Sequence, residues 1–245
     1  MELTAPHADF ELPPWADRLI VVFWWFFALA TVILLPGRED PEQSAQLSLA
    51  VRLLVSPLMP LFAWFVLHAI RHPVRALIRG LGLPRAARFA AVAAACGITL
   101  AVKFAAHGAA SGASPWPWGV SVAAYFLVFA GLLVAWLVLR SIWALSYQHV
   151  FWIGGLAFAL VEENHAALAT LARGDPLGAA LLLAYLLPIY GLPFAAVFML
   201  VPQEDLPRAR LRPGLVACAA CALVPLALYK YWGIAWHCLP GSAHL

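Results

Sequence analysis

The sequence predicts an all-α membrane protein, a polytopic bundle of about seven transmembrane helices. Two features of composition support this class: 64% of the 245 residues are hydrophobic and only 11% are charged, which is far from the usage of globular domains. The third observation is a series of apolar runs, each long enough to cross about 30 Å of hydrocarbon. These runs cover residues 18–36, 49–70, 88–107, 118–140, 149–172, 177–201 and 215–237.

No soluble domain fits between these runs, so we expect one membrane domain over residues 18–237 with terminal segments 1–17 and 238–245. Loops on the cytoplasmic side of a membrane are enriched in Lys and Arg, and the predicted spans divide the arginines ten to three. We therefore expect a cytoplasmic N-terminus and an outer C-terminus in a bacterial-type inner (plasma) membrane. The richer side holds Arg18, Arg71, Arg75, Arg79, Arg85, Arg88, Arg140, Arg208, Arg210 and Arg212.

Two of the predicted spans carry paired prolines, Pro57 and Pro60 in the second and Pro188 and Pro193 in the sixth. A proline inside a helix removes a backbone hydrogen bond and bends or breaks the helix, so we expect both spans to be bent. Each span is followed by an Arg-bearing loop and then by a small-residue helix with one late Lys. This order predicts a three-plus-one-plus-three repeat, and interrupted spans at corresponding positions are typical of transporter binding sites.

The fifth span carries the most unusual polar residues, Glu162, Glu163, Asn164 and His165, at its middle. Ionisable side chains at this depth are costly unless they face a protein interior or water. Both glutamates lie on a stripe of small residues, and such residues let membrane helices approach closely. We therefore expect both acids to face the protein interior. The stripe consists of Gly155, Ala159, Ala166, Ala169 and Thr170.

Both lysines of the chain, Lys103 and Lys230, lie inside apolar spans near their outer ends. Such a lysine either extends to the interface or pairs with an acid in the interior. His107 shares a helix face with Lys103, as His237 does with Lys230. We expect these four residues to bind substrate in the outer half of the membrane, close to Glu162, Glu163 and His165.

The leading functional hypothesis is a carrier or translocation protein, because two adjacent carboxylates cannot both ionise cheaply and are suited to exchange protons or bind a cation. The first alternative is a membrane-embedded hydrolase or transferase acting on a lipid or peptide, with Glu162 or Glu163 as general base and His165 as acid. The second alternative is a structural subunit of a membrane complex. The expected partners are the lipid bilayer and a small molecule, ion or lipid-like substrate, with a homo-oligomer or complex left open; no nucleic-acid motif is present.

The sequence names no cofactor and predicts no metal site. Glu162 and His165 have the spacing found in di-iron carboxylate bundles, but that chemistry uses a second such motif and two further glutamates. A metal held by Glu162, His165 and either His107 or His237 stays an alternative. Haem also stays open, because several histidines lie near helix ends although no haem-attachment motif occurs. They are His68, His107, His149 and His237.

Overall fold

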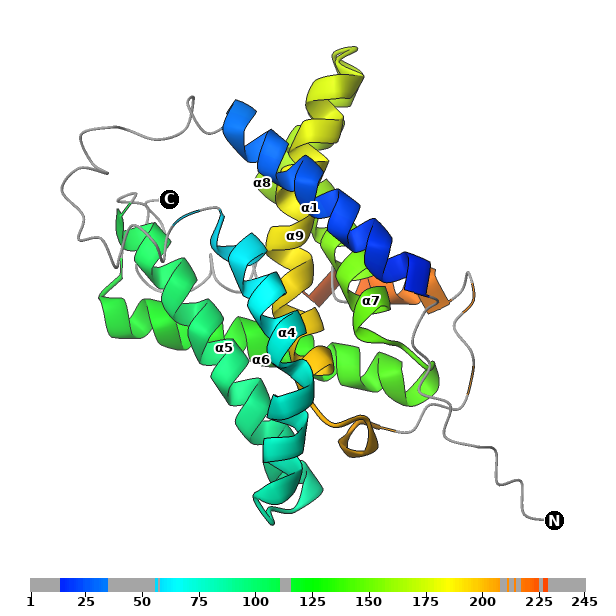
Figure 1. Cartoon of the computed structure of the whole chain (residues 1–245). Helices are drawn as coiled ribbons and strands as arrows, with labels where there is room; N and C mark the ends of the chain where they lie inside the picture. Colours follow the sequence, from blue (N-terminus) through cyan, green and yellow to red (C-terminus); the bar gives the residue numbers. More distant parts are fainter. Residues whose placement is uncertain are drawn as a thin grey trace.

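The computed structural model describes residues 14–34, 56, 58–110, 116–207, 211, 214, 217–224 and 227–228, with the backbone alone for 14, 34 and 161–165. Helices make up 88% of these residues, and the β-structure among them is an isolated bridge between Trp143 and Leu211. Three short elements are α7 (Tyr147–His149), the π-helical turn η2 (Val150–Gly154) and the 3-10 turn η3 (Gln203–Asp205). The long helices in Figure 1 are α1 (Pro14–Leu34), α4 (Met59–Gly80), α5 (Arg85–Ala110), α6 (Trp118–Ile142), α8 (Gly155–Ala172) and α9 (Pro176–Leu200).

Five of the described helices, α1, α4, α5, α6 and α9, are long and apolar enough to cross a membrane. They correspond to the first four predicted spans and the sixth. The fifth predicted span forms η2 and α8, and α8, with four polar residues in succession, is not one of the five. Most of the seventh lies outside the described residues. The all-helical class is confirmed, whereas the count of seven spans and the orientation stay predictions.

Helix α4 begins and ends later than predicted. Pro60 lies in its first turn, where a proline removes no intrahelical hydrogen bond, so the expected bend at Pro60 was wrong; Pro57 lies outside the described residues. The chain then stays helical through Pro73 to Gly80, until Gly82 adopts a φ of 64° that favours the end of a helix. The basic segment that we expected to be a loop is therefore the last part of α4.

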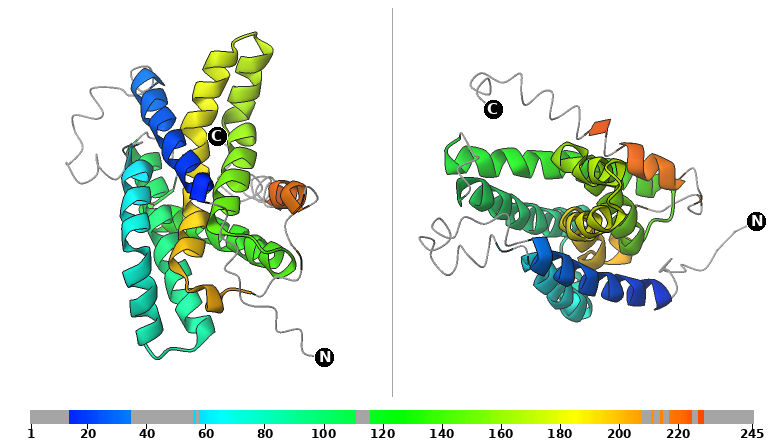
Figure 2. Two further views of the ribbon diagram at one scale, coloured as in Figure 1. Left: turned by 45° about the vertical axis from the view of Figure 1, so that its right-hand side comes forward. Right: turned by 90° about the horizontal axis from the view of Figure 1, so that it is seen from above.

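Helix α9 lies at the centre of the fold. It packs against α8, η2, α1, α4 and α5, and nearly all of its second half is buried, because its sequence is apolar on every side. As predicted, Pro188 and Pro193 lie inside this helix. Since Pro60 lies at a helix start and these two do not, the prolines give the predicted repeat no structural support. Figure 2 shows α8 and α9 projecting together from one end of the molecule and α4 and α5 extending toward the other.

A cluster of aromatic rings joins α1, α4 and η2. Trp64 lies 5.0 Å from Phe151 and 6.0 Å from Trp24 between ring centroids, and these three side chains are almost completely buried. The next residue, Trp25, is 75% exposed. Of these two adjacent tryptophans on α1, one therefore lies in the core and the other at the surface of the molecule.

Candidate functional site

A cavity of about 390 Å³ lies between α4, α5 and α9. Its walls are almost entirely apolar, which matches the common character of small-molecule sites. Three side chains with a hydroxyl, thiol or amino group also border it, and all three come from α5: Cys96, Thr99 and Lys103. The other lining residues are Met59, Pro60, Phe62, Ala63, Val66, Leu67, Ala95, Leu100, Phe104, Ile189, Leu192, Pro193, Ala196 and Leu200.

Lys103 is the charged residue of this lining, and it is only 9% exposed. Helix α5 extends to Ala110, so Lys103 lies about 10 Å from the helix end at 1.5 Å per residue. Its Nζ atom lies 5.1 Å from the centroid of the Phe104 ring, a cation–π contact. Within the described part of the chain, no hydrogen bond or ion pair to Lys103 occurs. The cavity therefore presents a cation without a described counter-charge.

A second cavity, of about 230 Å³, lies beside the first and shares part of its lining. Leu100 and Phe104 of α5, together with Ile189 and Pro193 of α9, border both cavities. Phe158 of α8 also lines the second cavity, but no described residue of α8 lines the first. The described residues of α8 thus border the second cavity and not the one that contains Lys103.

The described residues of α8 follow the predicted face only in part. Gly155 and Ala159 on the small-residue stripe are buried, whereas Leu168 and Leu171 on the opposite side are exposed. Ala169 belongs to the stripe but is exposed, and Ala157 lies off the stripe but is buried. The last turns of α8 project with α9 beyond the other helices (Figure 2). The inward orientation of Glu162 and Glu163 therefore stays a prediction.

The grouping of the predicted site residues stays a prediction. Lys103 lines the first cavity, and His107, one turn further along α5, is exposed. The backbone of Glu162, Glu163 and His165 lies in α8, but their side chains are outside the described part. Lys230 and His237 lie outside the described residues altogether.

A polar network that we did not predict joins α1, α4 and α7. The Tyr147 hydroxyl donates to Asp17 Oδ1 at 2.7 Å and accepts from Arg71 Nη1 at 3.1 Å. Gln148 Nε2 donates to the same Asp17 oxygen at 2.9 Å. Tyr147 and Gln148 are each 1% exposed, so the network satisfies buried polar atoms, as a folded interior requires.

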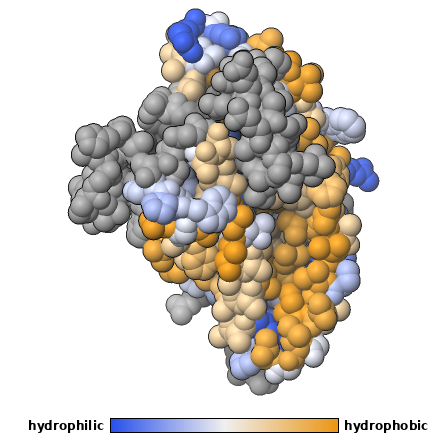
Figure 3. Space-filling model, turned by 90° about the vertical axis from the view of Figure 1, so that its left-hand side faces the viewer, coloured by the Kyte–Doolittle hydropathy of each residue, from blue (hydrophilic) through white to orange (hydrophobic). Residues whose placement is uncertain are grey.

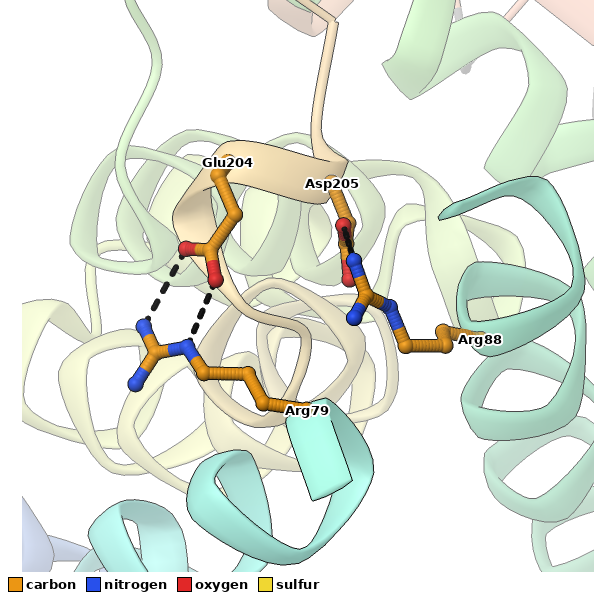
Figure 4. A network of polar contacts seen from close by, with 4 residues as sticks. All are labelled: Arg79, Arg88, Glu204 and Asp205. Carbon is orange, nitrogen blue, oxygen red and sulfur yellow. Dashed lines mark hydrogen bonds and ion pairs between the residues drawn. The ribbon is translucent and has the colours of Figure 1, made fainter. Parts of the chain in front are cut away.

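A second group of polar contacts gathers on η3, where three consecutive residues each accept from an arginine of a different helix. Arg140 of α6 donates to Gln203 Oε1 at 3.2 Å. The other two contacts, drawn in Figure 4, are ion pairs: Arg79 of α4 with Glu204, at 2.6 and 3.1 Å, and Arg88 of α5 with Asp205, at 2.6 Å. Because η3 directly follows α9, these pairs connect one end of all three helices that line the first cavity.

The two ion pairs differ in burial. The side chains of Arg79 and Glu204 are 51% and 41% exposed, whereas those of Arg88 and Asp205 are 14% and 0% exposed. In the sequence, these arginines indicated only the orientation of the chain in the membrane. The sequence feature that could have indicated these ion pairs is the two adjacent acids, Glu204 and Asp205, directly after an apolar span. The basic segments of the chain need such counter-charges.

Comparison of the chain with known protein families, curated proteins and solved structures found no match. The features of this chain that indicate a function are the buried cation Lys103, the cavity around it and the ion pairs that join the lining helices.

The exposed ion pair between Arg79 and Glu204 should make the stability of the protein depend slightly on pH. The hydrogen bond from Arg79 lowers the pKa of Glu204 to about 2 from an ordinary 4.5. A group whose pKa is lower in the folded state stabilises the protein above its unfolded pKa, and this contribution is lost as the pH falls toward the folded pKa. It should be small, because solvent screens an exposed pair.

We expect Glu204→Gln to lower the melting temperature slightly at neutral pH, and the difference from wild type to shrink steadily between about pH 4.5 and pH 2. Melting curves of both proteins in detergent across this range measure the effect. A difference that stays constant down to the lowest pH would show that the carboxylate does not contribute through its charge.

Proposed function

We propose that the protein is a small multi-pass carrier or translocation protein of a bacterial-type inner membrane, whose substrate occupies the cavity between α4, α5 and α9. The observation that carries this proposal is the burial of Lys103 in that apolar cavity. A buried charge is unfavourable without a partner, so a site with one described cation is suited to receive an opposite charge.

The central position of α9 supports a carrier rather than a rigid scaffold. This helix borders the cavity and contains both Pro188 and Pro193. Interior prolines leave backbone carbonyls without their helical partners, and such interrupted helices at membrane depth are typical of transporter sites. The ion pairs with Arg79 of α4 and Arg88 of α5 lie beyond the end of α9, at η3. Because α9 borders the cavity, movement of α9 relative to the other two helices would change the access to Lys103.

The glutamates of α8 complete the proposed mechanism. Glu162 and Glu163 exchange protons or bind a cation, and His165 assists the proton transfer. Lys103, His107, Lys230 and His237 provide substrate contacts in the outer half of the membrane. The proposal includes seven spans, an N-terminus in the cytoplasm and an outer C-terminus.

Cys96 provides a native probe of this proposal, because it lines the cavity. In a variant in which Cys218, Cys221 and Cys238 are replaced by serine, we expect a membrane-impermeant maleimide to label Cys96 from either side of the membrane. The reason is that a carrier opens its site to the two aqueous sides in turn. Labelling is measured in right-side-out and in inverted vesicles.

Ile98 offers a matched control, because it lies two residues further along α5 and is 52% exposed on the outer surface of the helix. A cysteine at this position, with Cys96 replaced by alanine, should face lipid and stay unlabelled from both sides. Labelling of Cys96 from one side only would contradict the carrier and favour the enzyme hypothesis, in which a fixed cleft opens to one side. Absence of labelling from both sides would contradict both.

The role of the glutamates is tested by the same measurement. If they exchange protons, the ratio of labelling from the two sides should change with pH in the wild-type background. This change should be lost in Glu162→Gln or Glu163→Gln, because glutamine keeps the shape of the side chain and removes the titrating proton. An unaltered pH response in both variants would remove the glutamates from the mechanism.

A further inference from the structure

The cavity around Lys103 opens between α4 and α5 at the surface of the helix bundle. Phe62 of α4 is 73% exposed, and Ala95 and Thr99 of α5 are also exposed, yet all three border the cavity. The face on which α4 and α5 lie carries apolar side chains over much of its described surface (Figure 3). An opening in such a face leads into the hydrocarbon layer, so a lipid-soluble molecule can enter without crossing water.

The volume of the cavity limits what it can hold. If each methylene group takes about the volume of a water molecule in the liquid, roughly 30 Å³, then 390 Å³ accommodates one chain of on the order of a dozen carbons. A phospholipid with two full acyl chains is too large. The apolar walls contribute favourably along the whole length of such a chain.

The polar atoms of the cavity determine which head group fits. No acid occurs among the lining residues, and the Thr99 hydroxyl already donates to the Ala95 carbonyl at 2.8 Å. The Lys103 ammonium is therefore the available charged donor of the described lining. An ammonium is a compact single charge, which matches a monovalent carboxylate. A phosphate group, with more charge and more acceptors, is better matched by the forked donors of arginine.

We propose that this cavity binds a single-chain carboxylate amphiphile, that is, a fatty-acid-like molecule whose carboxylate pairs with Lys103 and whose alkyl chain lies against α4 and α9. The inference rests on the proposed function in one respect, because it identifies the substrate class of the same site. It also accounts for the position of Lys103, since a carboxylate at this depth offsets the cost of burying the ammonium.

Dodecanoate is the probe for this site, and dodecanol is its uncharged counterpart. Binding of both, radiolabelled, is measured by equilibrium binding to the full chain in nanodiscs near pH 8, with empty nanodiscs as background. We expect saturable binding of dodecanoate that is weakened at least about tenfold in Lys103→Gln, the loss expected for a hydrogen bond to a charged group. Lys103→Arg should retain most of the affinity. Dodecanol should bind wild type and Lys103→Gln equally.

Two further variants separate the cavity from the charge. Arg85→Gln removes a positive charge at the start of α5 from a residue that does not line the cavity, and it should leave dodecanoate binding unchanged. Ala63→Phe places a ring in the cavity and should abolish binding of both ligands. Melting temperatures show whether each variant is folded. If Lys103→Gln does not fold, the comparison of dodecanoate with dodecanol and dodecyl phosphate on wild type decides the question.

Equal binding of dodecanoate to wild type and Lys103→Gln would overturn the proposal, as would tighter binding of dodecyl phosphate than of dodecanoate. The outcome is independent of the labelling of Cys96. Two-sided labelling without dodecanoate binding would leave the carrier in place and remove the substrate class. Dodecanoate binding with one-sided labelling would keep the ligand and remove the carrier.

Discussion

Replacing Gly191 by alanine should lower the melting temperature by roughly 2–12 °C, on the scale of roughly 2–4 °C per kcal/mol for a chain of this size. A Cβ atom at Gly191 would lie 2.5 Å from the Phe151 carbonyl oxygen and 3.3 Å from the Gly155 Cα atom. These neighbours are backbone atoms and cannot rotate away. Helix α9 would have to move away from η2 and α8, and overpacking of this kind costs about 1–3 kcal/mol or more.

Gly131 provides the matched control, because it lies in the exposed surface of α6 and a Cβ there would meet nothing within 4 Å. Gly131→Ala should leave the melting temperature unchanged or raise it slightly, since alanine favours helix more than glycine does. Thermal melting of both variants in the same detergent compares them. Equal stability of the two would mean that α8 and α9 do not approach as closely at Gly191 as described.

Removing Arg88 should destabilise the protein far more than removing Arg79. Arg88→Ala leaves the fully buried carboxylate of Asp205 without its cation, and an uncompensated buried charge costs about 3–5 kcal/mol. Arg79→Ala breaks a pair that is about half exposed, which is worth about 0–1 kcal/mol. The two arginines bind adjacent residues of η3, yet the same substitution by alanine should have a large effect on stability at Arg88 and a small one at Arg79.

The double variant Arg88→Leu with Asp205→Leu tests the reason for this difference. Because it removes both charges and fills the space with apolar atoms, it should recover most of the stability that Arg88→Ala loses. Melting temperatures of the single and double variants form the comparison. If Arg88→Ala were no more harmful than Arg79→Ala, burial would not determine the strength of these pairs.

The sequence predicted the helical class and most helix positions because apolar length is a local property. The errors concern places where local signals compete. The segment from Arg71 to Arg79, with three arginines and Pro73, resembles a loop after an apolar span, yet α4 continues through it to Gly80. Pro60 was expected to bend the second predicted span. It lies instead in the first turn of α4, where a proline removes no intrahelical hydrogen bond.

The sequence left two positions open for Lys103, extension to the interface or pairing with an acid in the interior, and its burial in a cavity favours the interior. Its grouping with the glutamates stays a prediction. The partners of Arg79 and Arg88 could not be predicted, because Glu204 and Asp205 are 125 and 117 positions away along the chain. Helical periodicity also does not distinguish Trp24 from Trp25, since the partner surface decides which of two adjacent rings is enclosed.

The arrangement of arginines around η3 has a consequence for how the protein responds to its ionic surroundings. Salt weakens attraction between exposed charges and affects enclosed pairs much less. Raising the ionic strength should therefore weaken the ion pair between Arg79 and Glu204 and leave the enclosed pair between Arg88 and Asp205 largely intact. Of the two helices that η3 holds by an ion pair, α4 is thus the one whose ion pair dissolved salt weakens.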